Sequence, residues 1–356
     1  MTTQAMDAAK AEAFAGKMLG LLNTSMLGLL VSIGHQTGLF DAMEKLPAST
    51  SKQIAKAANL NERYVREWLG GMVTGGIVDY DPKAQTYKLA PEHASFLTRS
   101  AGQNNLAFFA SYISVLGDVE QKVIKSFKTG GGVPYSEYPR FQAVQGEESA
   151  MLYDSALIPV VLPMVPGLVE RLKKGITVAD VGCGQGHAIN VMAKAFPKST
   201  FVGYDFSKEG VAAGKAEAKK WKLKNARFEV KDIGAMDLRG TFDLLTALDT
   251  IHDQAKPMTV LKNIRAALKP GGDFLMMDIA GSSHLHENIQ HPLGPTLYAI
   301  STLHCMTVSL AYEGEGLGTV WGEQKAQEYL KRAGFKDITV KHIKGDPMHV
   351  FFIAKK

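Results

Sequence analysis

The second half of the chain alternates short apolar runs with segments whose apolar residues recur every three or four positions. Short apolar runs predict buried strands, and the longer period predicts helices. The predicted strands span 176–181, 200–204, 226–230, 242–248 and 272–279, and the predicted helices span 186–196, 208–222, 257–268 and 322–333. Because strands that alternate with helices form βαβ units, we expect a parallel sheet with helices on both faces. Residues 337–343 and 349–355, joined by Gly345-Asp346-Pro347, predict an antiparallel hairpin at the sheet edge.

The first third of the chain has a different pattern. Residues 17–47 predict two helices that end near Gly38 and Pro47, and we expect the apolar stretch 18–33 to be a buried helix, at a subunit interface. A helix ending at Ala58, a turn, a helix over 62–72 and a hairpin around 81–83 follow in the order of a winged helix.

The remaining segments complete the domain prediction. A helical pair is expected at 100–128, a loop rich in glycine and aromatic residues at 129–146, and a long helical segment at 292–312. We therefore expect a winged-helix or dimerisation domain at 1–100, a helical linker that covers a pocket at 101–165, and an α/β domain at 166–356.

Composition narrows the class of protein. The 356 residues are 46% apolar and 21% charged, as in globular proteins, and the net charge of +5 is too small to indicate nucleic acid or an anionic membrane. Cys183 and Cys305 are the two cysteines, which excludes a disulfide framework and fits the cytoplasm. We expect neither a secretory signal nor a membrane partner, since the apolar stretch 18–33 is interrupted by polar residues and shorter than the roughly 20 residues of a bilayer span.

Three glycines at alternate positions lie where the first predicted strand of the α/β region passes into the following helix. The stretch VADVGCGQGH places Gly182, Gly184 and Gly186 between them, as in a nucleotide-binding βα unit. A dinucleotide motif would need a glycine where His187 stands, so we expect a ligand without a phosphate at this turn.

Acidic residues follow the next two strands. Asp205 ends the second strand, where it can accept both hydroxyls of a ribose, and Asp232 follows the third, where it can accept from an adenine amino group. The alternatives are that the glycines serve only close packing of strand and helix, and that Asp205 is a helix N-cap.

Together, D-x-G-x-G-x-G at 180–186, Asp205, Asp232 and LKPGG at 268–272 resemble the class I S-adenosylmethionine-dependent methyltransferases. The resemblance implies a Rossmann-like, seven-stranded α/β sheet at 166–356 that binds S-adenosylmethionine. The cofactor-binding residues it implies, with two aromatic residues of the preceding loop that could close over the ligand, are Asp180, Gly182, Gly184, Gly186, Asp205, Phe206, Asp232, Ile233, Leu248, Asp249, Tyr138 and Phe141.

A base is expected after the fourth strand, where His252 and Asp253 reach the same sheet edge. An imidazole that titrates near neutral pH can remove the proton of a hydroxyl acceptor. The segment is similar to that of small-molecule O-methyltransferases with an N-terminal winged-helix dimerisation domain, which implies His252 as base and a homodimer. Gln254 stands where many of those enzymes have an aromatic residue, and S- or N-methylation and a merely packing His252 are the alternatives.

Further side chains are candidates for the pocket of a small-molecule acceptor. They are Tyr135, Tyr298, Ser301, His304, Cys305 and Trp321. The chain has neither the proline turn of nucleic-acid amino methyltransferases after the fourth strand nor a Pro-Cys pair, so no nucleic-acid substrate is expected. His284, His286 and His291 have metal-ligand spacing but no evident fourth ligand, and we expect a solvated loop and no metal.

Two other functions fit parts of the pattern. One is a DNA-binding regulator whose winged helix reads DNA while the Rossmann-like domain senses a ligand, but Arg63 and Arg66 are few cations for phosphate contacts. The other is a catalytically inactive scaffold that binds the cofactor without turnover.

Overall fold

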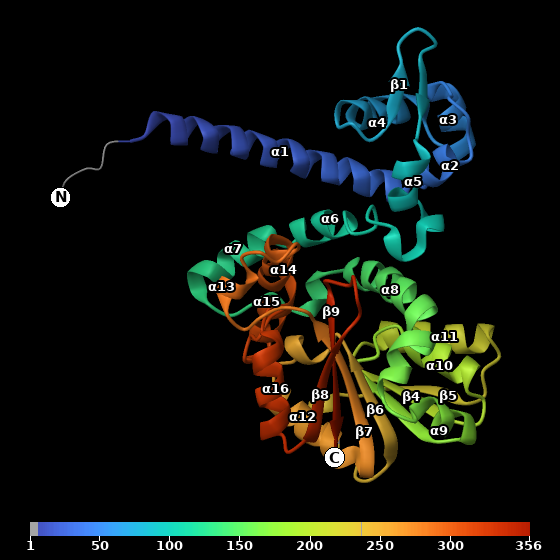
Figure 1. Ribbon diagram of the computed structural model, residues 1–356, viewed down its shortest axis with the longest axis vertical. Helices are drawn as coiled ribbons and strands as arrows, with labels where there is room; N and C mark the ends of the chain where they lie inside the picture. Colours follow the sequence, from blue (N-terminus) through green and yellow to red (C-terminus); the bar gives the residue numbers. More distant parts are fainter. Residues whose placement is uncertain (1–5, 236) are drawn as a thin grey trace. The chain divides into compact units, whose positions relative to one another are not determined.

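The computed structural model describes residues 6–235 and 237–356, which separate into two compact units on either side of the Gly117–Asp118 bond (Figure 1). The first unit contains α1 (Ala8–Gln36), α2 (Leu39–Glu44), α3 (Ser51–Ala58), α4 (Glu62–Thr74), β1 (Asp79–Asp81), β2 (Thr86–Lys88), α5 (Pro91–Leu97), η1 (Arg99–Asn104) and α6 (Ser111–Gly117).

The segment from α3 to β2 confirms the predicted helix, turn, helix and hairpin. Thr50 caps α3 in a capping box with Gln53, and Asn59 ends that helix in the left-handed region at φ 53°. Trp68 of α4 is 4% exposed and donates its indole N–H to the carbonyl of Leu30 in α1, so the end of α1 is tied to the winged helix.

Helix α1 differs from its prediction. It has 29 residues and begins at the Asp7 cap, because Thr24 and Ser25 return their hydroxyls to carbonyls one turn earlier and do not interrupt it. The expectation of a buried helix is wrong for the single chain, since Leu19 and Met26 are each 62% exposed and the first two thirds of α1 lie away from the rest of its unit (Figure 1). By length and composition α1 could cross a membrane, and among the described helices only the pair Phe141–Met164 and Leu168–Lys174, bent by 106°, also passes that test.

The second unit is the α/β unit. Its elements are α7 (Glu120–Thr129), η2 (Tyr135–Glu137), α8 (Phe141–Leu152), η3 (Tyr153–Val161), η4 (Leu162–Met164), α9 (Leu168–Lys174), β3 (Thr177–Val181), α10 (His187–Ala195), β4 (Thr200–Asp205), α11 (Lys208–Lys220), β5 (Ala226–Val230), η5 (Ile233–Ala235), β6 (Phe242–Leu248), η6 (Ile251–Asp253), α12 (Pro257–Ala267), β7 (Leu268–Ile279), α13 (Leu285–Asn288), α14 (Gly294–Ile300), η7 (Ser301–Cys305), α15 (Met306–Ala311), α16 (Gly322–Arg332), β8 (Lys336–His342) and β9 (His349–Lys355).

The sheet of this unit has seven strands in the order β5-β4-β3-β6-β7-β9-β8. The first five pair in parallel, and β9 is antiparallel to both β7 and β8, which confirms the predicted sheet and its edge hairpin. The chain leaves β3 toward β4 on one side and returns to β6 on the other. Such a reversal opens a crevice at the carboxyl ends of the strands, where open α/β sheets bind ligands.

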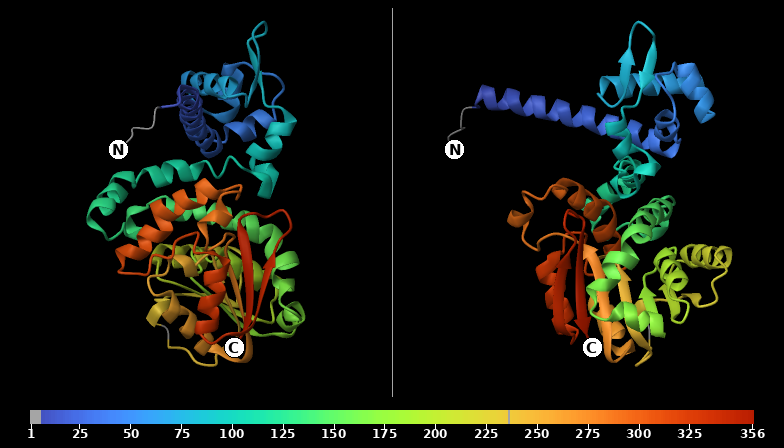
Figure 2. Two further views of the ribbon diagram at one scale, coloured as in Figure 1. Left: turned by 60° about the vertical axis from the view of Figure 1, so that its left-hand side comes forward. Right: turned by 45° about the vertical axis from the view of Figure 1, so that its right-hand side comes forward.

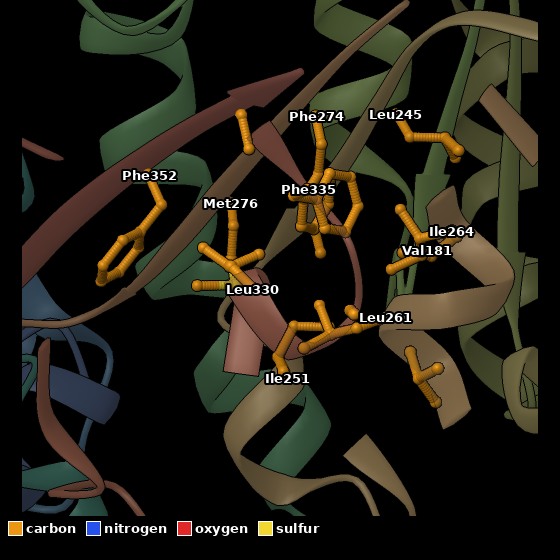
Figure 3. Packing of buried hydrophobic residues seen from close by; sticks show 14 of the residues in the cluster. Val181, Leu245, Ile251, Leu261, Ile264, Phe274, Met276, Leu330, Phe335 and Phe352 are labelled. Atoms are coloured by element: carbon orange, nitrogen blue, oxygen red, sulfur yellow. The ribbon is translucent and has the colours of Figure 1, made fainter. Parts of the chain in front are cut away.

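Alternate side chains of each strand supply the two cores on the faces of the sheet. On one face Leu245, Phe274 and Met276 pack against Leu261 of α12 and Leu330 of α16, and all five are almost completely buried (Figure 3). The opposite face packs against a second set of buried side chains from α9, α10 and η3. Because both faces are dry, the strands are held rigidly and their carboxyl ends are fixed relative to one another.

Two segments near those carboxyl ends differ from their predictions. The predicted loop 129–146 is wrong from Phe141 onward, where α8 begins. The predicted helix 292–312 is interrupted by the π-helical turn η7, and such turns often occur at functional sites. Figures 1 and 2 show α8, α14 and α15 beyond the carboxyl ends of the parallel strands.

Candidate functional site

The glycine turn after β3 has one position that faces open space. Gly182, Gly184 and Gly186 all have positive φ, between 51° and 72°. A Cβ at Gly182 would lie 2.2 Å from Thr250 and one at Gly186 would lie 2.2 Å from Phe228, so these two glycines are required by packing. Apart from its two chain neighbours, no described residue has an atom within 4 Å of the place where a Cβ of Gly184 would stand. At Gly184 the backbone can therefore be approached closely by a ligand.

Asp205 is held in position directly beside this turn. It is 6% exposed, and its Oδ2 accepts from the amide of Gly184 at 2.8 Å while its Oδ1 accepts from the amide of Ser207 at 2.8 Å. Burial raises the pKa of Asp205, against these hydrogen bonds. Each carboxylate oxygen has two lone pairs, so both retain capacity for a further donor.

Two more carboxyl groups line the crevice. Burial raises the pKa of Asp180 to about 7, and its Oδ1 accepts from Thr246 at 2.6 Å. Burial also raises the pKa of Asp249 to about 7, and among the described residues its Oδ1 has no hydrogen-bond partner. Asp249 has a left-handed φ of 52°, an uncommon conformation for a residue other than glycine.

A pocket joins these groups to α8. Residues 101–165 were expected to cover a pocket, but the α8 side chains that line it after Phe141 were not singled out, because 129–146 was expected to be a loop. The pocket is lined by Gln142, Gln145, Gly146, Ser149, Tyr153, Asp180, Gly182, Cys183, Gly184, Gln185, Gly186, His187, Leu248 and Asp249.

The residues expected around an adenine lie at the end of β5. Asp232 is exposed and its Oδ1 accepts from the amide of Gly234 at 2.7 Å, while Ile233 is 4% exposed. The turn therefore presents a carboxylate beside an apolar side chain.

His252 forms a buried pair with Asp278. The Nδ1 of His252 lies 2.8 Å from the Oδ1 of Asp278, which also accepts from the indole N–H of Trp321 at 3.1 Å. Burial alone would lower the pKa of His252, but the charge of Asp278 and contacts with Cys305 outweigh it and raise the pKa well above its usual value. Asp278 engages Nδ1, and Cys305 also hydrogen-bonds the ring, so Nε2 is the ring nitrogen without a carboxylate partner.

Asp278 was not among the residues expected from the sequence. Asp253, which was, has its pKa raised to about 6 by burial, and the hydrogen-bonding carboxylate of His252 is Asp278 instead. The signal that could have indicated Asp278 is an acidic residue near the carboxyl end of β7, the same arrangement as Asp205 at the end of β4.

Two family models match the chain. One, described as an Rv2258c-like winged HTH domain, matches residues 25–99. The other, described as a methyltransferase domain, matches residues 172–334 and spans the glycine turn, Asp205, His252 and Asp278. Residues 172–334 are thus a methyltransferase domain that follows a winged HTH domain at 25–99. The resemblance read from the sequence motifs is thereby confirmed, including the winged-helix domain that precedes the methyltransferase domain.

Curated relatives of this methyltransferase match parts of its length. Trans-aconitate 2-methyltransferase of Deinococcus radiodurans is 36% identical over 110 residues, which is 30% of this chain and 39% of the relative. Ubiquinone biosynthesis O-methyltransferase of Vibrio parahaemolyticus is 32% identical over 100 residues, 28% of this chain and 41% of the relative. The chain thus spans about two fifths of the length of each of these two relatives.

Solved structures resemble the methyltransferase over nearly its whole length. A crystallised protein of Nostoc punctiforme has a TM-score of 0.74 at 16% identity and covers 96% of this chain and 98% of its own. Human N-acetylserotonin methyltransferase, in complex with S-adenosylmethionine, has a TM-score of 0.69 at 17% identity and covers 100% and 99%. At such identities these likenesses establish a shared fold.

Aromatic side chains gather on the His252 side of the methyltransferase crevice. Phe141 stacks on His304 with ring centroids 3.6 Å apart, and Tyr138 contacts the edge of His304 at 4.8 Å. Tyr135 lies 5.6 Å from His304 and 5.6 Å from Phe206, the residue after Asp205. Tyr135 therefore connects the cofactor side of the crevice with the His252 side.

Of the remaining pocket candidates, Cys305 and Trp321 lie beside His252 and Asp278, whereas Tyr298 and Ser301 are hydrogen-bonded to other residues. Cys305 is 6% exposed and contacts His252, whereas Tyr298 is 38% exposed and its hydroxyl accepts from Asn288. Ser301 accepts from the amide of Thr319, and Trp321, which is 3% exposed, holds Asp278. Ser301 and Cys305 are the first and last residues of the π-turn, and Tyr298 lies in α14 before it.

The histidine-rich loop contains no metal cluster in the part of the chain that the structure describes. His284 and His286 are exposed and stack with centroids 5.8 Å apart. Within residues 6–235 and 237–356, no group of three or more His, Cys, Asp or Glu side chains is placed to hold a metal ion.

Proposed function

We propose that the protein transfers the methyl group of S-adenosylmethionine to a hydroxyl oxygen of a small molecule, with His252 as the general base. The observation that supports this most strongly is the buried pair of His252 and Asp278 at the sheet edge that also bears the glycine turn. A polar pair with so little exposure is costly to bury unless its groups are satisfied, and a proton acceptor with a fixed tautomer is what hydroxyl methylation requires.

The residues of the crevice fit this cofactor. Gly184 leaves space for the methionyl part, and Asp205 has lone pairs for both ribose hydroxyls. The unpartnered Oδ1 of Asp249 suits the methionyl ammonium, while Asp232 and Ile233 frame the adenine. S-adenosylmethionine carries a sulfonium and an ammonium, so a crevice lined with carboxyl groups attracts it.

The chain's own contribution to the reaction is alignment and proton removal. When bound, the sulfonium supplies an electrophilic methyl carbon and leaves as a neutral thioether. The acceptor oxygen would bond to that carbon as the bond between carbon and sulfur breaks, so the residues of the crevice would hold oxygen, carbon and sulfur in line. Nε2 of His252 takes the hydroxyl proton, and Asp278 stabilises the resulting imidazolium through Nδ1. We propose oxygen over sulfur or nitrogen because a hydroxyl depends most on such a base.

The proposal is tested by measuring S-adenosylhomocysteine by mass spectrometry after incubation with S-adenosylmethionine and a pool of hydroxyaromatic compounds. We expect acceptor-dependent formation of S-adenosylhomocysteine, and its loss in His252→Ala. Binding of S-adenosylmethionine without any such product would contradict the proposal and favour a scaffold or sensor.

The winged helix supports a dimerisation role better than a DNA-binding one. In α4, Arg63 is paired with Glu67, and Arg66 lies 3.5 Å from Glu62. Cations that are paired on their own helix are less available to phosphates, and a DNA-binding helix needs several of them.

We propose that the protein is a homodimer in which a second copy covers the exposed apolar side chains of α1. Phe14, Leu19, Leu22 and Met26 are each more than half exposed. Exposed apolar patches of this kind mark interaction surfaces. Residues 101–165 are proposed to connect this domain to the methyltransferase domain, and within this segment α8 and Tyr153 line the pocket.

A further inference from the structure

His304 is a buried imidazole that is left without a hydrogen bond by residues 6–235 and 237–356. It is 1% exposed and lies in the π-turn η7, one residue before Cys305. Among the described residues, neither of its ring nitrogens has a hydrogen-bond partner. A buried donor or acceptor without a partner costs about 1–3 kcal/mol, and so requires an explanation.

The surroundings of His304 leave only its ring edge for such a partner. Phe141 covers one face at 3.6 Å in nearly parallel orientation, with an interplanar angle of 7°. Tyr138 and Tyr135 approach as edge contacts at 4.8 and 5.6 Å, and the hydroxyl of Tyr138 is already engaged, donating to the carbonyl of Leu303. The aromatic side chains thus orient the imidazole without hydrogen-bonding it.

His304 lies beside the proposed base. The adjacent Cys305 contacts His252, and the charge of His252 acts on His304. Burial, followed by this charge, lowers the pKa of His304 to about 3, so the ring is neutral at physiological pH. A neutral imidazole offers one N–H donor and one acceptor.

Charges near the site limit what can occupy it. Asp205 and Asp253 both act electrostatically on Tyr135, and Asp278 lies behind His252. The positive charge of His252 opposes only part of the charge of these three carboxyl groups, so an anionic acceptor is disfavoured.

Building on the proposed function, we propose that His304 is a specificity-determining residue that hydrogen-bonds a second polar group of the acceptor. The acceptor is then an uncharged hydroxy compound with a flat ring that carries another hydroxyl or carbonyl near the hydroxyl that is methylated. Such a group would satisfy the orphaned imidazole, while an acceptor without it would leave the imidazole unpaired. Sites built to hydrogen-bond a substrate group reject analogues that lack that group for this reason.

The test compares acceptors that differ only in the second group. The kcat/KM of the wild-type protein is measured for catechol and resorcinol against phenol, and for 2-hydroxybenzamide against 2-hydroxybenzoate. We expect at least a tenfold preference for the better dihydroxy compound over phenol, and for the neutral amide over the anion. His304→Phe should bring the first ratio close to one by lowering the dihydroxy value, and His304→Gln should retain part of it. His284→Phe, the same change at an exposed position, should leave both ratios unchanged.

Each outcome has a defined meaning. A wild-type ratio near one, or a ratio that survives in His304→Phe, would overturn the inference. So would a wild-type protein that binds S-adenosylmethionine and methylates other hydroxy compounds but none of this panel. If thermal unfolding shows that His304→Phe does not fold, the inference is judged from the kcat/KM ratios of the wild-type protein and of His304→Gln. A protein that does not bind S-adenosylmethionine would instead refute the proposed function itself.

Discussion

The Nδ1 of His252 lies 2.8 Å from the Oδ1 of Asp278, and the two residues are 4% and 0% exposed. In the proposed mechanism the pair orients His252, and Nε2 takes a proton from the acceptor. His252→Ala should therefore lower kcat by about 10²-fold or more. The dissociation constant for S-adenosylmethionine should change little, since His252 is not part of the pocket around the glycine turn. His286→Ala, at an exposed histidine, is the matched control, and an unchanged kcat in His252→Ala would remove His252 from the mechanism.

The pH dependence of kcat/KM tests the role of Asp278. Protonated His252 cannot accept a proton, so kcat/KM should rise with pH along a limb centred above the usual histidine pKa of 6.5. Asp278→Asn removes the charge that raises this pKa, so the limb should move to lower pH while the plateau falls. Asp278→Glu should restore the position of the limb. A limb that stays in place in Asp278→Asn would show that Asp278 has only a structural role.

The exposed side chains of α1 predict the oligomeric state. Leu22 is 55% exposed, and a charge introduced there should weaken association if a second copy covers it. We expect the mass of a dimer from sedimentation velocity or light scattering for the wild-type protein, and a shift toward monomer for Leu22→Glu. Lys17→Gln changes the net charge by the same amount at an exposed polar position and should remain dimeric. A monomeric wild-type protein would refute the proposed dimer.

His349 predicts a pH-dependent stability. Its Nδ1 lies 2.9 Å from Asp346, and its Nε2 lies 3.9 Å from Asp249. Burial opposes its charge, but these carboxylates raise the pKa of His349 to about 9. Protonated His349 therefore stabilises the fold. This stabilisation is complete below about pH 6.5 and is lost as the pH rises through about 9.

Urea unfolding followed at several pH values measures this effect. His349→Gln should lower the free energy of unfolding by about 3 kcal/mol near pH 6, and the difference from wild type should shrink above pH 9. His342→Gln, at a half-exposed ion pair with Glu323, should show a much smaller difference at every pH. A loss in His349→Gln that is constant from pH 6 to 10 would mean that packing, not charge, explains it.

Much of the fold and of the cofactor crevice follows from local signals in the sequence. The apolar runs that become β3 and β4 end directly before Gly182 and at Asp205, so a strand prediction also locates these residues at one sheet edge. Strand pairing brings these two ends together, because β3 and β4 are parallel neighbours that pair from Thr177 opposite Thr200 to Val181 opposite Tyr204.

The pairing of His252 with Asp278 and the pocket wall depend on tertiary contacts that cannot be inferred from the sequence. Asp278 reaches His252 because β6 and β7 pair with Leu248 opposite Met277, and because Trp321, from the loop before α16, donates to the same carboxylate. The exposure of α1 could not be inferred from its apolar residues, since an apolar run alone does not indicate whether the rest of its own chain covers it.

The central claim is that the turn around Gly184 and the carboxylate of Asp205 bind S-adenosylmethionine, and calorimetric titration of the purified protein with S-adenosylhomocysteine tests it most directly. We expect saturable binding at one site per chain. Asp205→Asn should weaken it roughly ten- to a hundredfold, as expected for lost hydrogen bonds to a charged group. The exposed Asp237→Asn, whose thermal unfolding should match that of the wild type, should bind normally. Absence of any heat of binding in the wild-type protein, or full affinity in Asp205→Asn, would contradict the account.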